Sequence, residues 1–256
     1  MRRIPLARLF IGAALGGLLA AAPARAADDA KLPKVEWSFA GPFGTYDLAS
    51  AQRGFLIYQQ VCSNCHSMNQ LYYRNLEGIG LSEEQIKAVA ASVQVPGGVD
   101  DNGQPIQRPG RPADHFRAPF PNDQAARAAN GGALPPDQSV LELAREGGAD
   151  YLYAVMVGYA DPPADMKMQP GMMFNKYFPG HQIAMPQPLQ DGSVQYTDGT
   201  KPTLEQEAKD VVTFLAWAAE PEMVERKQMG VKIILFLLLL TGLTYAVKRK
   251  LWSDVH

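Results

Sequence analysis

The stretch VCSNCHSM, residues 61–68, contains both cysteines of this 256-residue chain. Cys62 and Cys65 are separated by two residues, and His66 directly follows the second thiol. Three kinds of site use two thiols at this spacing: a redox disulfide, a zinc site and a covalent haem attachment site. The rest of the sequence helps to separate them.

The histidines and the surroundings of the motif favour haem attachment over the other two kinds of site. A structural zinc site needs four ligands, and the motif supplies three at most. The remaining histidines, His115, His181 and His256, include no second ligand pair. A thioredoxin-type disulfide does not require the adjacent histidine, and no strand–helix pattern of that fold surrounds the motif. Haem attachment uses both thiols as thioethers and His66 as the proximal iron ligand.

The residues before the motif predict a helix. From Arg53 to Val61, helical spacing places Gly54, Phe55, Tyr58 and Val61 on one face. Such a face could pack on a partner helix and on the edge of a porphyrin, but an ordinary core helix has the same pattern. The sequence leaves these two interpretations open.

A second helix is predicted over residues 203–217. Thr203 is a suitable N-cap, and acidic residues at 205 and 207 suit the first turn. The apolar stripe consists of Leu204, Ala208, Val211 and Leu215. Glu220-Pro221 should end the helix. We expect it to pack against the helix that begins near Arg53.

A haem that only transfers electrons needs a sixth iron ligand. The methionine candidates include Met156, Met166, Met168, Met172, Met173 and Met185. Met185 is favoured because Pro186 and Pro188 stiffen its loop, while Ile183 and Leu189 could shield the ring. A His/Met pair would raise the reduction potential. His115 and His181 are the rival ligands.

The region between the two ligand segments is rich in turn-forming residues. Residues 96–136 contain 8 prolines and 6 glycines in 41 positions, which excludes long helices and strands. We expect this region to wrap the haem. Arg127 is a candidate partner for a haem propionate, although an exposed surface arginine fits the same sequence.

Both ends of the chain carry apolar segments. Basic residues, an apolar run over residues 9–22 and Ala24-Arg-Ala26 predict a signal peptide over residues 1–26 that is cleaved; a retained anchor is the alternative. Residues 229–248 predict a transmembrane helix, since the 19 apolar-rich residues 229–247 would span about 28 Å; the alternative is a buried core helix. The basic residues that follow place residues 249–256 in the cytoplasm and residues 27–228 outside it.

The predicted exported part is acidic. Of the 24 basic and 26 acidic residues in the chain, 16 basic and 25 acidic residues lie within residues 28–230, a net charge of −9. This balance argues against nucleic acid as a partner. It fits a cationic protein partner, or simply an acidic surface that keeps the domain soluble.

Several motifs together resemble the cytochrome c1 family, the haem subunits of cytochrome bc1 complexes, in its bacterial form. They lie at residues 62–66, 120–137, 158–163 and 177–186, followed by the apolar C-terminal segment. The resemblance covers nearly all of residues 35–250. It implies a mainly α fold: a class I cytochrome c-like helical haem domain with long loop insertions, plus one C-terminal transmembrane helix.

The resemblance also implies one covalently bound haem c and a role for each site residue. Cys62 and Cys65 would form the thioethers, His66 and Met185 would bind the iron, and Arg127 would contact a propionate. With only two cysteines, the chain lacks an extra disulfide that braces the distal loop in some relatives. Pro186, Pro188 and packing must then hold Met185.

The implied function is electron relay within a quinol–cytochrome c oxidoreductase, as a carrier subunit rather than an enzyme on its own. The partners would be a cytochrome b subunit, a Rieske iron–sulfur subunit, a soluble c-type cytochrome and the lipid bilayer, in a dimeric complex. The location would be the bacterial inner membrane, with the haem domain periplasmic. A dense acidic loop of some relatives is reduced here to Asp100-Asp101, which leaves the docking patch for the soluble cytochrome undefined.

Two other functions remain compatible with the motif. One is a free-standing, membrane-tethered cytochrome c that donates electrons to an oxidase or reductase. The other is a haem enzyme, such as a peroxidase, with an open sixth position. The family-like loops favour the electron relay subunit, and a sixth ligand would disfavour the peroxidase.

Overall fold

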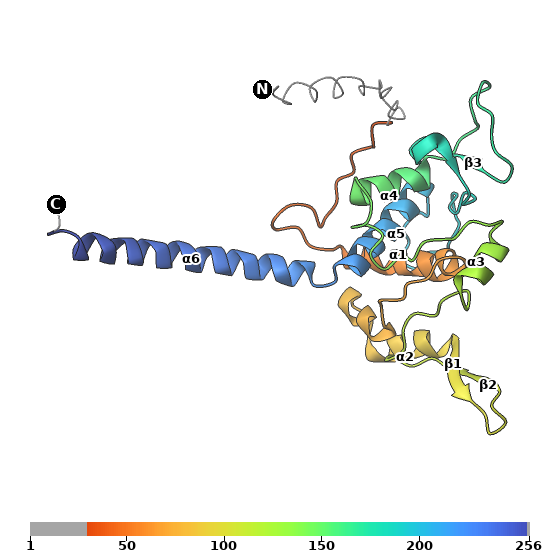
Figure 1. Cartoon of the computed structure of the whole chain (residues 1–256), viewed down its shortest axis with the longest axis horizontal. Coiled ribbons are helices and arrows are strands. Elements are labelled where there is room, and N and C mark those ends of the chain that lie inside the picture. Colours follow the sequence, from red (N-terminus) through yellow and green to blue (C-terminus); the bar gives the residue numbers. More distant parts are fainter. Residues whose placement is uncertain (1–29, 255–256) are drawn as a thin grey trace, which may run out of the picture.

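The computed structural model describes residues 30–254, so the predicted signal peptide over residues 1–26 lies outside the described residues. The described chain forms a mainly helical domain with long loops, from which one helix projects (Figure 1). The α-helices are α1 Leu48–Gln60, α2 Glu83–Ala91, α3 Asp123–Ala129, α4 Gly148–Val157, α5 Leu204–Ala219 and α6 Met223–Leu251. The expected mainly α architecture is therefore confirmed.

The centre of the domain is the crossing of α1 and α5, the two helices predicted from the sequence. They pack against each other, and α4 packs on α5, as Figure 1 shows. Gly54 permits this close approach, because a Cβ atom at that position would lie 2.0 Å from the Asp210 carbonyl oxygen. The expected N-cap is also present, since the Thr203 hydroxyl accepts a hydrogen bond from Gln206 N.

Aromatic side chains fill the space beside this crossing. Phe214 of α5 lies 5.6 Å from Phe55 and 5.7 Å from Tyr58, measured between ring centroids. Phe116, from the long loop region, packs on both α1 rings. These tilted ring pairs bury large apolar surfaces, which is the main source of stability in such a core.

A buried ion pair also joins the two helices. Asp210 is fully buried and accepts hydrogen bonds from Arg53 Nε at 2.8 Å and Ser50 Oγ at 2.7 Å. Arg53 extends to Asp198, again at 2.8 Å. The carboxylate is thus satisfied in the core, where an unpaired charge would be strongly destabilising.

The Pro- and Gly-rich region has no long regular element, as expected, but it contains a hairpin that the composition did not indicate. Strands β1 Gln94–Val99 and β2 Pro105–Pro109 are antiparallel. The Asp100 carboxylate caps the turn by accepting from Asn102 N and Gln104 N. Such turns depend on local side-chain hydrogen bonds, which a count of prolines and glycines does not reveal.

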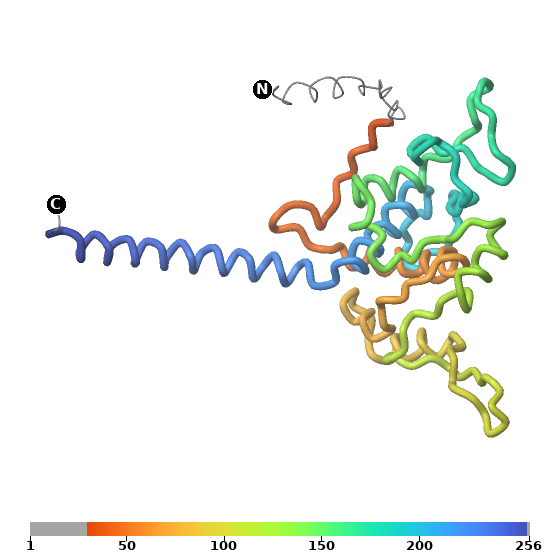
Figure 2. Tube along the Cα trace, in the orientation of Figure 1, coloured from red at the N-terminus to blue at the C-terminus, as the bar shows by residue number. Residues whose placement is uncertain are grey.

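Short elements complete the domain. The 3₁₀ segments are η1 Cys62–Asn64, η2 Tyr73–Ile79 and η3 Pro179–His181, and a second small sheet pairs β3 Met173–Phe174 with β4 Gln182–Ile183. Figure 2 shows that the β1–β2 hairpin and the loop after α4 project from the side of the domain opposite α6.

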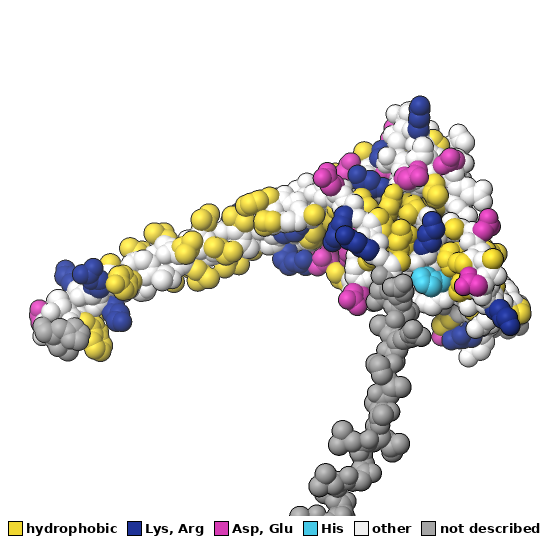
Figure 3. Space-filling view, turned by 90° about the horizontal axis from the view of Figure 1, so that it is seen from above, with side chains coloured by type: hydrophobic (Ala, Val, Ile, Leu, Met, Phe, Trp, Pro, Cys, Tyr) yellow, Lys and Arg dark blue, Asp and Glu magenta, His cyan; other side chains and the backbone are white. Residues whose placement is uncertain are grey.

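Helix α6 contains the whole segment that the sequence predicted to span a membrane. Within residues 30–254 it is the one helix long and apolar enough to do so, and none of its most apolar window is buried in the protein. Figure 3 shows hydrophobic side chains along most of its length, with basic side chains near both ends. Its last turn carries Lys248, Arg249 and Lys250. These features fit a single-pass membrane anchor rather than a core helix.

Candidate haem site

The cysteine–histidine motif forms one tight turn directly after α1. Cys65 N and His66 N both donate to the Cys62 carbonyl, at 3.1 and 2.8 Å. The structure therefore brings Cys62, Cys65 and His66 together, as the spacing predicted. Both cysteines are free thiols, and residues 30–254 contain no cluster of three or more His, Cys, Asp or Glu side chains suited to a metal ion.

His66 is held as a buried, neutral imidazole. Its side chain is buried, and its Nδ1 atom lies 2.8 Å from the Pro136 carbonyl oxygen. Burial lowers the pKa of His66, which favours the neutral ring. A neutral imidazole that donates from Nδ1 to a carbonyl keeps the lone pair of Nε2 for a metal.

Asp137 fixes the segment that supplies this carbonyl. Its carboxylate accepts from Ser67 Oγ at 2.7 Å, Asn69 N at 2.8 Å and Ser139 N at 2.9 Å. Burial opposes ionisation of Asp137, but these hydrogen bonds outweigh it and lower the pKa of the carboxyl group. Sequence reasoning did not single out Pro136 or Asp137, although both belong to the quoted motif over residues 120–137.

The Cys62 thiol is not a typical redox nucleophile. Burial raises its pKa to about 12, so it stays protonated at neutral pH. Catalytic thiols of disulfide oxidoreductases have lowered pKa values, because the thiolate is the reactive form. This property weakens the redox-disulfide interpretation and is compatible with a thiol that is consumed once, in forming a thioether.

Met185 lies on a separate loop, just after β4. Its backbone carbonyl accepts a hydrogen bond from the Tyr159 hydroxyl at 3.0 Å. Ile183 and Leu189, which flank it in the sequence, are both buried. Burial raises the pKa of Tyr159, which keeps this phenol protonated as a donor. Sequence reasoning assigned no role to Tyr159, although it belongs to the motif over residues 158–163, because a hydrogen bond across 26 positions leaves no local pattern.

The two rival histidines differ in their surroundings. His115 is exposed and stacks on Tyr72, with ring centroids 3.9 Å apart. His181 has φ of 58° and a buried Nδ1 without a hydrogen-bond partner among the described residues. The His115 ring already packs against Tyr72, which does not favour it as an iron ligand. His181 lies four residues before Met185 in the sequence, so it remains a rival ligand.

Arg127 lies on the surface of α3. It is exposed, and its Nη1 donates to the Gly132 carbonyl at 3.2 Å, within its own segment. This contact is local and gives no further support to a propionate contact, which stays a prediction.

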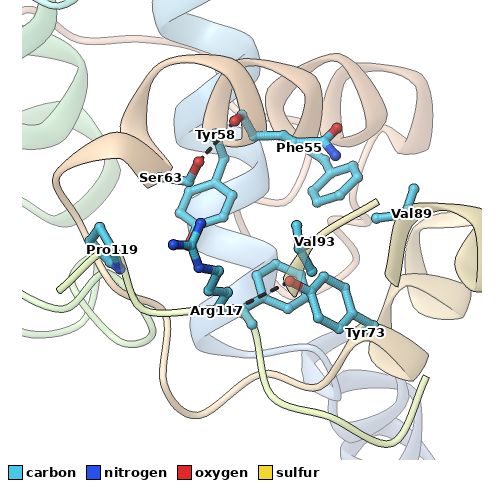
Figure 4. Close-up of a pocket in the computed structure, with 10 residues that line it drawn as sticks. Phe55, Tyr58, Ser63, Tyr73, Val89, Val93, Arg117 and Pro119 are labelled. Atoms are coloured by element: carbon cyan, nitrogen blue, oxygen red, sulfur yellow. Dashed lines mark hydrogen bonds between the residues drawn. The ribbon is translucent and has the colours of Figure 1, made fainter. Parts of the chain in front are cut away.

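Figure 4 shows a small pocket beside the C-terminal half of α1, with a volume of about 70 Å³. It is lined by aromatic residues, including Tyr58 and Tyr73, and by Arg117. No cysteine, histidine or methionine lines it. The pocket is therefore distinct from the candidate ligand set.

The donor chemistry of the motif fits a covalently attached haem. Two free thiols and a neutral, buried imidazole share one turn. The thiols can add to two vinyl groups, and the free Nε2 can bind the iron of the same porphyrin. A thioether such as that of Met185 is a soft sixth ligand.

Comparisons with known proteins agree with this chemistry. The model of the cytochrome C1 family matches residues 37–255. The chain is 48% identical to cytochrome c1 of Rhodospirillum rubrum over 240 residues, covering 88% of each protein. It is 49% identical to a mitochondrial cytochrome c1 haem protein of Solanum tuberosum, covering 95% of each. It is 43% identical to "Cytochrome b/c1" of Bradyrhizobium diazoefficiens, of which it spans 40%. A match over this much of the chain establishes that the protein belongs to the cytochrome c1 family.

Proposed function

We propose that this protein is the electron relay of a quinol–cytochrome c oxidoreductase. It accepts single electrons from a Rieske iron–sulfur subunit and passes them to a soluble c-type cytochrome. The observation that carries this proposal is the His66 imidazole, bound through Nδ1 to the Pro136 carbonyl beside two free thiols. That set suits a permanently attached haem c rather than a zinc ion or a redox disulfide.

The side chains have separate tasks in this function. A bound haem c supplies the one-electron couple. Cys62 and Cys65 would tether the ring, and His66 and Met185 would ligate the iron. Since a thioether favours ferrous iron, Met185 raises the reduction potential. With both His66 and Met185 as ligands, peroxidase chemistry would be disfavoured. Arg127 is proposed to contact a propionate.

The anchor supports a place in a membrane complex. By the positive-inside rule, the basic last turn of α6 supports a cytoplasmic C-terminus and a periplasmic haem domain at a bacterial inner membrane. Residues 1–26 would direct export and be removed. The name "Cytochrome b/c1" of one relative supports a cytochrome b subunit as neighbour. The complex is proposed to be dimeric.

Purification from membranes in mild detergent tests the assembly. We expect a tagged chain to bring down a b-type cytochrome with several haems and an iron–sulfur protein. Recovery of the tagged chain alone would instead support a free-standing, membrane-tethered cytochrome c. An untagged strain processed in parallel controls for non-specific recovery.

A substitution of Met185 tests the site. Met185→Leu should leave the haem covalently attached but lower the midpoint potential by a sizeable part of the roughly 0.8 V range that axial ligands span. Met173→Leu is the matched control, because Met173 is exposed on the nearby strand β3. An unchanged potential in Met185→Leu would remove Met185 from the iron.

A further inference from the structure

The loop that carries Met185 is joined to the end of α4 by side-chain hydrogen bonds. Tyr159, two residues beyond the last residue of α4, donates from its hydroxyl to the Met185 carbonyl at 3.0 Å. Among the described residues, this phenol is the one side-chain donor to Met185. The contact fixes the backbone of the residue whose side chain is proposed to bind iron.

Asn175 holds Tyr159 and the loop in register. Its side chain is fully buried, and its Nδ2 donates to the Val155 carbonyl of α4 at 2.8 Å. Its Oδ1 accepts from Tyr177 N and Phe178 N, at 3.0 and 3.2 Å. An isolated antiparallel bridge pairs Asn175 with Tyr159. One buried amide thus ties the end of α4 to the start of the Met185 loop.

The backbone adds two further ties. Asn175 N donates to the His181 carbonyl at 3.0 Å, and Lys176 N donates to the Gly158 carbonyl at 2.9 Å. Gly158 has no room for a side chain, since a Cβ there would lie 2.8 Å from Asn175 Oδ1. These contacts make the end of α4 and residues 174–183 one braced unit. Met185 lies outside this unit, and the Tyr159 hydroxyl is the side-chain group that hydrogen-bonds to it.

No covalent brace can replace these bonds, because both cysteines lie in the haem motif. The prolines at 186 and 188 restrict the backbone but do not attach the loop to the domain. The β3–β4 pair consists of two residues in each strand and ends before Met185. Burial of Ile183 and Leu189 anchors the loop on both sides of Met185, and the Tyr159 hydrogen bond is the side-chain contact that reaches Met185 directly.

We propose that Tyr159 is a positioning residue for Met185, holding the loop so that the thioether stays on the iron. The inference rests on the proposed role of Met185 as distal ligand. An iron–thioether bond opens when its loop swings away, and a bond from the domain to the Met185 carbonyl lowers the population of that open state. Tyr159 itself does not touch the iron.

Tyr159→Phe in the full-length, haem-loaded protein tests this role, since it removes the hydroxyl and keeps the ring. We expect imidazole to bind the ferric haem about three- to tenfold faster, the range expected from losing one hydrogen bond. We also expect the far-red thioether-to-iron band to disappear at a lower denaturant concentration. Covalent haem content should not change.

Tyr153→Phe is the matched control. Tyr153 lies on α4, stacks edge-on against Trp37 and has no side-chain hydrogen bond among the described residues. Imidazole binding within twofold of wild type in Tyr159→Phe would overturn the proposal. So would a gain in binding rate that is fully matched by loss of global stability, measured by far-UV circular dichroism, because it would show a general structural effect.

Met185→Leu separates failure of this inference from failure of the proposed function. If Met185→Leu leaves the far-red band intact, Met185 is not the ligand, and the proposed roles of Met185 and Tyr159 both fall, while the electron-relay function is still tested by the membrane purification. If Met185→Leu abolishes the band while Tyr159→Phe leaves imidazole binding unchanged, only the role of Tyr159 falls.

Discussion

Some buried polar groups on α1 and α5, and just before α1, have hydrogen-bond partners within the protein, whereas others have none. The Asp210 carboxylate has Arg53 and Ser50 as donors, and the Tyr46 hydroxyl donates to the Ala216 carbonyl at 3.0 Å. The Tyr58 hydroxyl is equally buried but has no hydrogen-bond partner among the described residues. Burial raises the pKa of Tyr58, so the group remains a neutral phenol.

The Tyr58 hydroxyl should contribute nothing to stability. A buried, unsatisfied hydroxyl costs about 1–3 kcal/mol, so Tyr58→Phe should leave the free energy of unfolding unchanged or raise it by about 1 kcal/mol. Tyr46→Phe is the control and should lower it by about 1 kcal/mol, since it breaks a bond. Denaturant unfolding measures both. A clear loss in Tyr58→Phe would mean that the hydroxyl binds water or another group in the pocket of Figure 4.

At the scale of elements, the α1–α5 crossing depends on a residue without a side chain. A Cβ on Gly54 would lie 2.0 Å from the Asp210 carbonyl oxygen and 2.7 Å from Phe214 Cβ. Both neighbours are rigid parts of α5, so the two helices would have to separate.

Gly54→Ala should therefore destabilise the domain by about 3 kcal/mol, despite the higher helix propensity of alanine. Gly230→Ala in α6 is the control, because no atom lies within 4 Å of a Cβ there. Denaturant unfolding followed by far-UV circular dichroism gives the comparison. Equal stability of the two variants would contradict the close packing of α1 on α5.

The β1–β2 hairpin is attached to the domain by an ion pair. Arg108 on β2 makes two hydrogen bonds of 2.6 Å to the Asp114 carboxylate. The bonds from Arg108, together with the Arg111 amide, lower the pKa of Asp114 from 3.8 to about 2. The pair thus stabilises the folded state when Asp114 is ionised.

This pair predicts a loss of stability in acid. The folded pKa lies below the unfolded one, so the contribution is complete above about pH 4 and is lost as the pH falls toward 2. Because the pair is partly exposed, the effect should be modest. Arg108→Gln should be less stable than wild type at pH 7, and the difference should shrink below pH 3 in denaturant titrations. A pH-independent difference would mean that Arg108 acts through packing alone.

At the scale of the whole molecule, charge and apolarity are separated along the chain. Residues 28–230 carry a net charge of −9, while the exposed surface of α6 is apolar between basic ends. The anchor limits the domain to the membrane surface, and the acidic domain attracts cationic proteins over a distance set by the ionic strength.

Electron transfer to a cationic soluble cytochrome should accordingly slow as salt is added. Stopped-flow measurements should show the second-order rate constant falling by at least about tenfold between low and near-molar ionic strength. A neutral small-molecule oxidant, which feels no such attraction, should react at a nearly constant rate. A salt-independent rate with the cationic cytochrome would mean that its docking patch is not acidic.

The sequence by itself determined the features that rest on local spacing and composition. Helical periodicity predicted α1 and α5, an N-cap signal placed the start of α5, and continuous apolarity predicted the segment within α6. The spacing of Cys62, Cys65 and His66 predicted that the three side chains lie close together, because all three belong to a five-residue segment.

Only the tertiary structure decided which distant groups support those residues. The Pro136 carbonyl bonded to His66 lies 70 positions from it in the sequence, and the Tyr159 hydroxyl bonded to the Met185 carbonyl lies 26 positions from Met185. Such bonds are made when separate segments pack, so they leave no periodicity in the sequence. The residue types that can bind haem were visible in the sequence, whereas their protonation and position were decided by the fold.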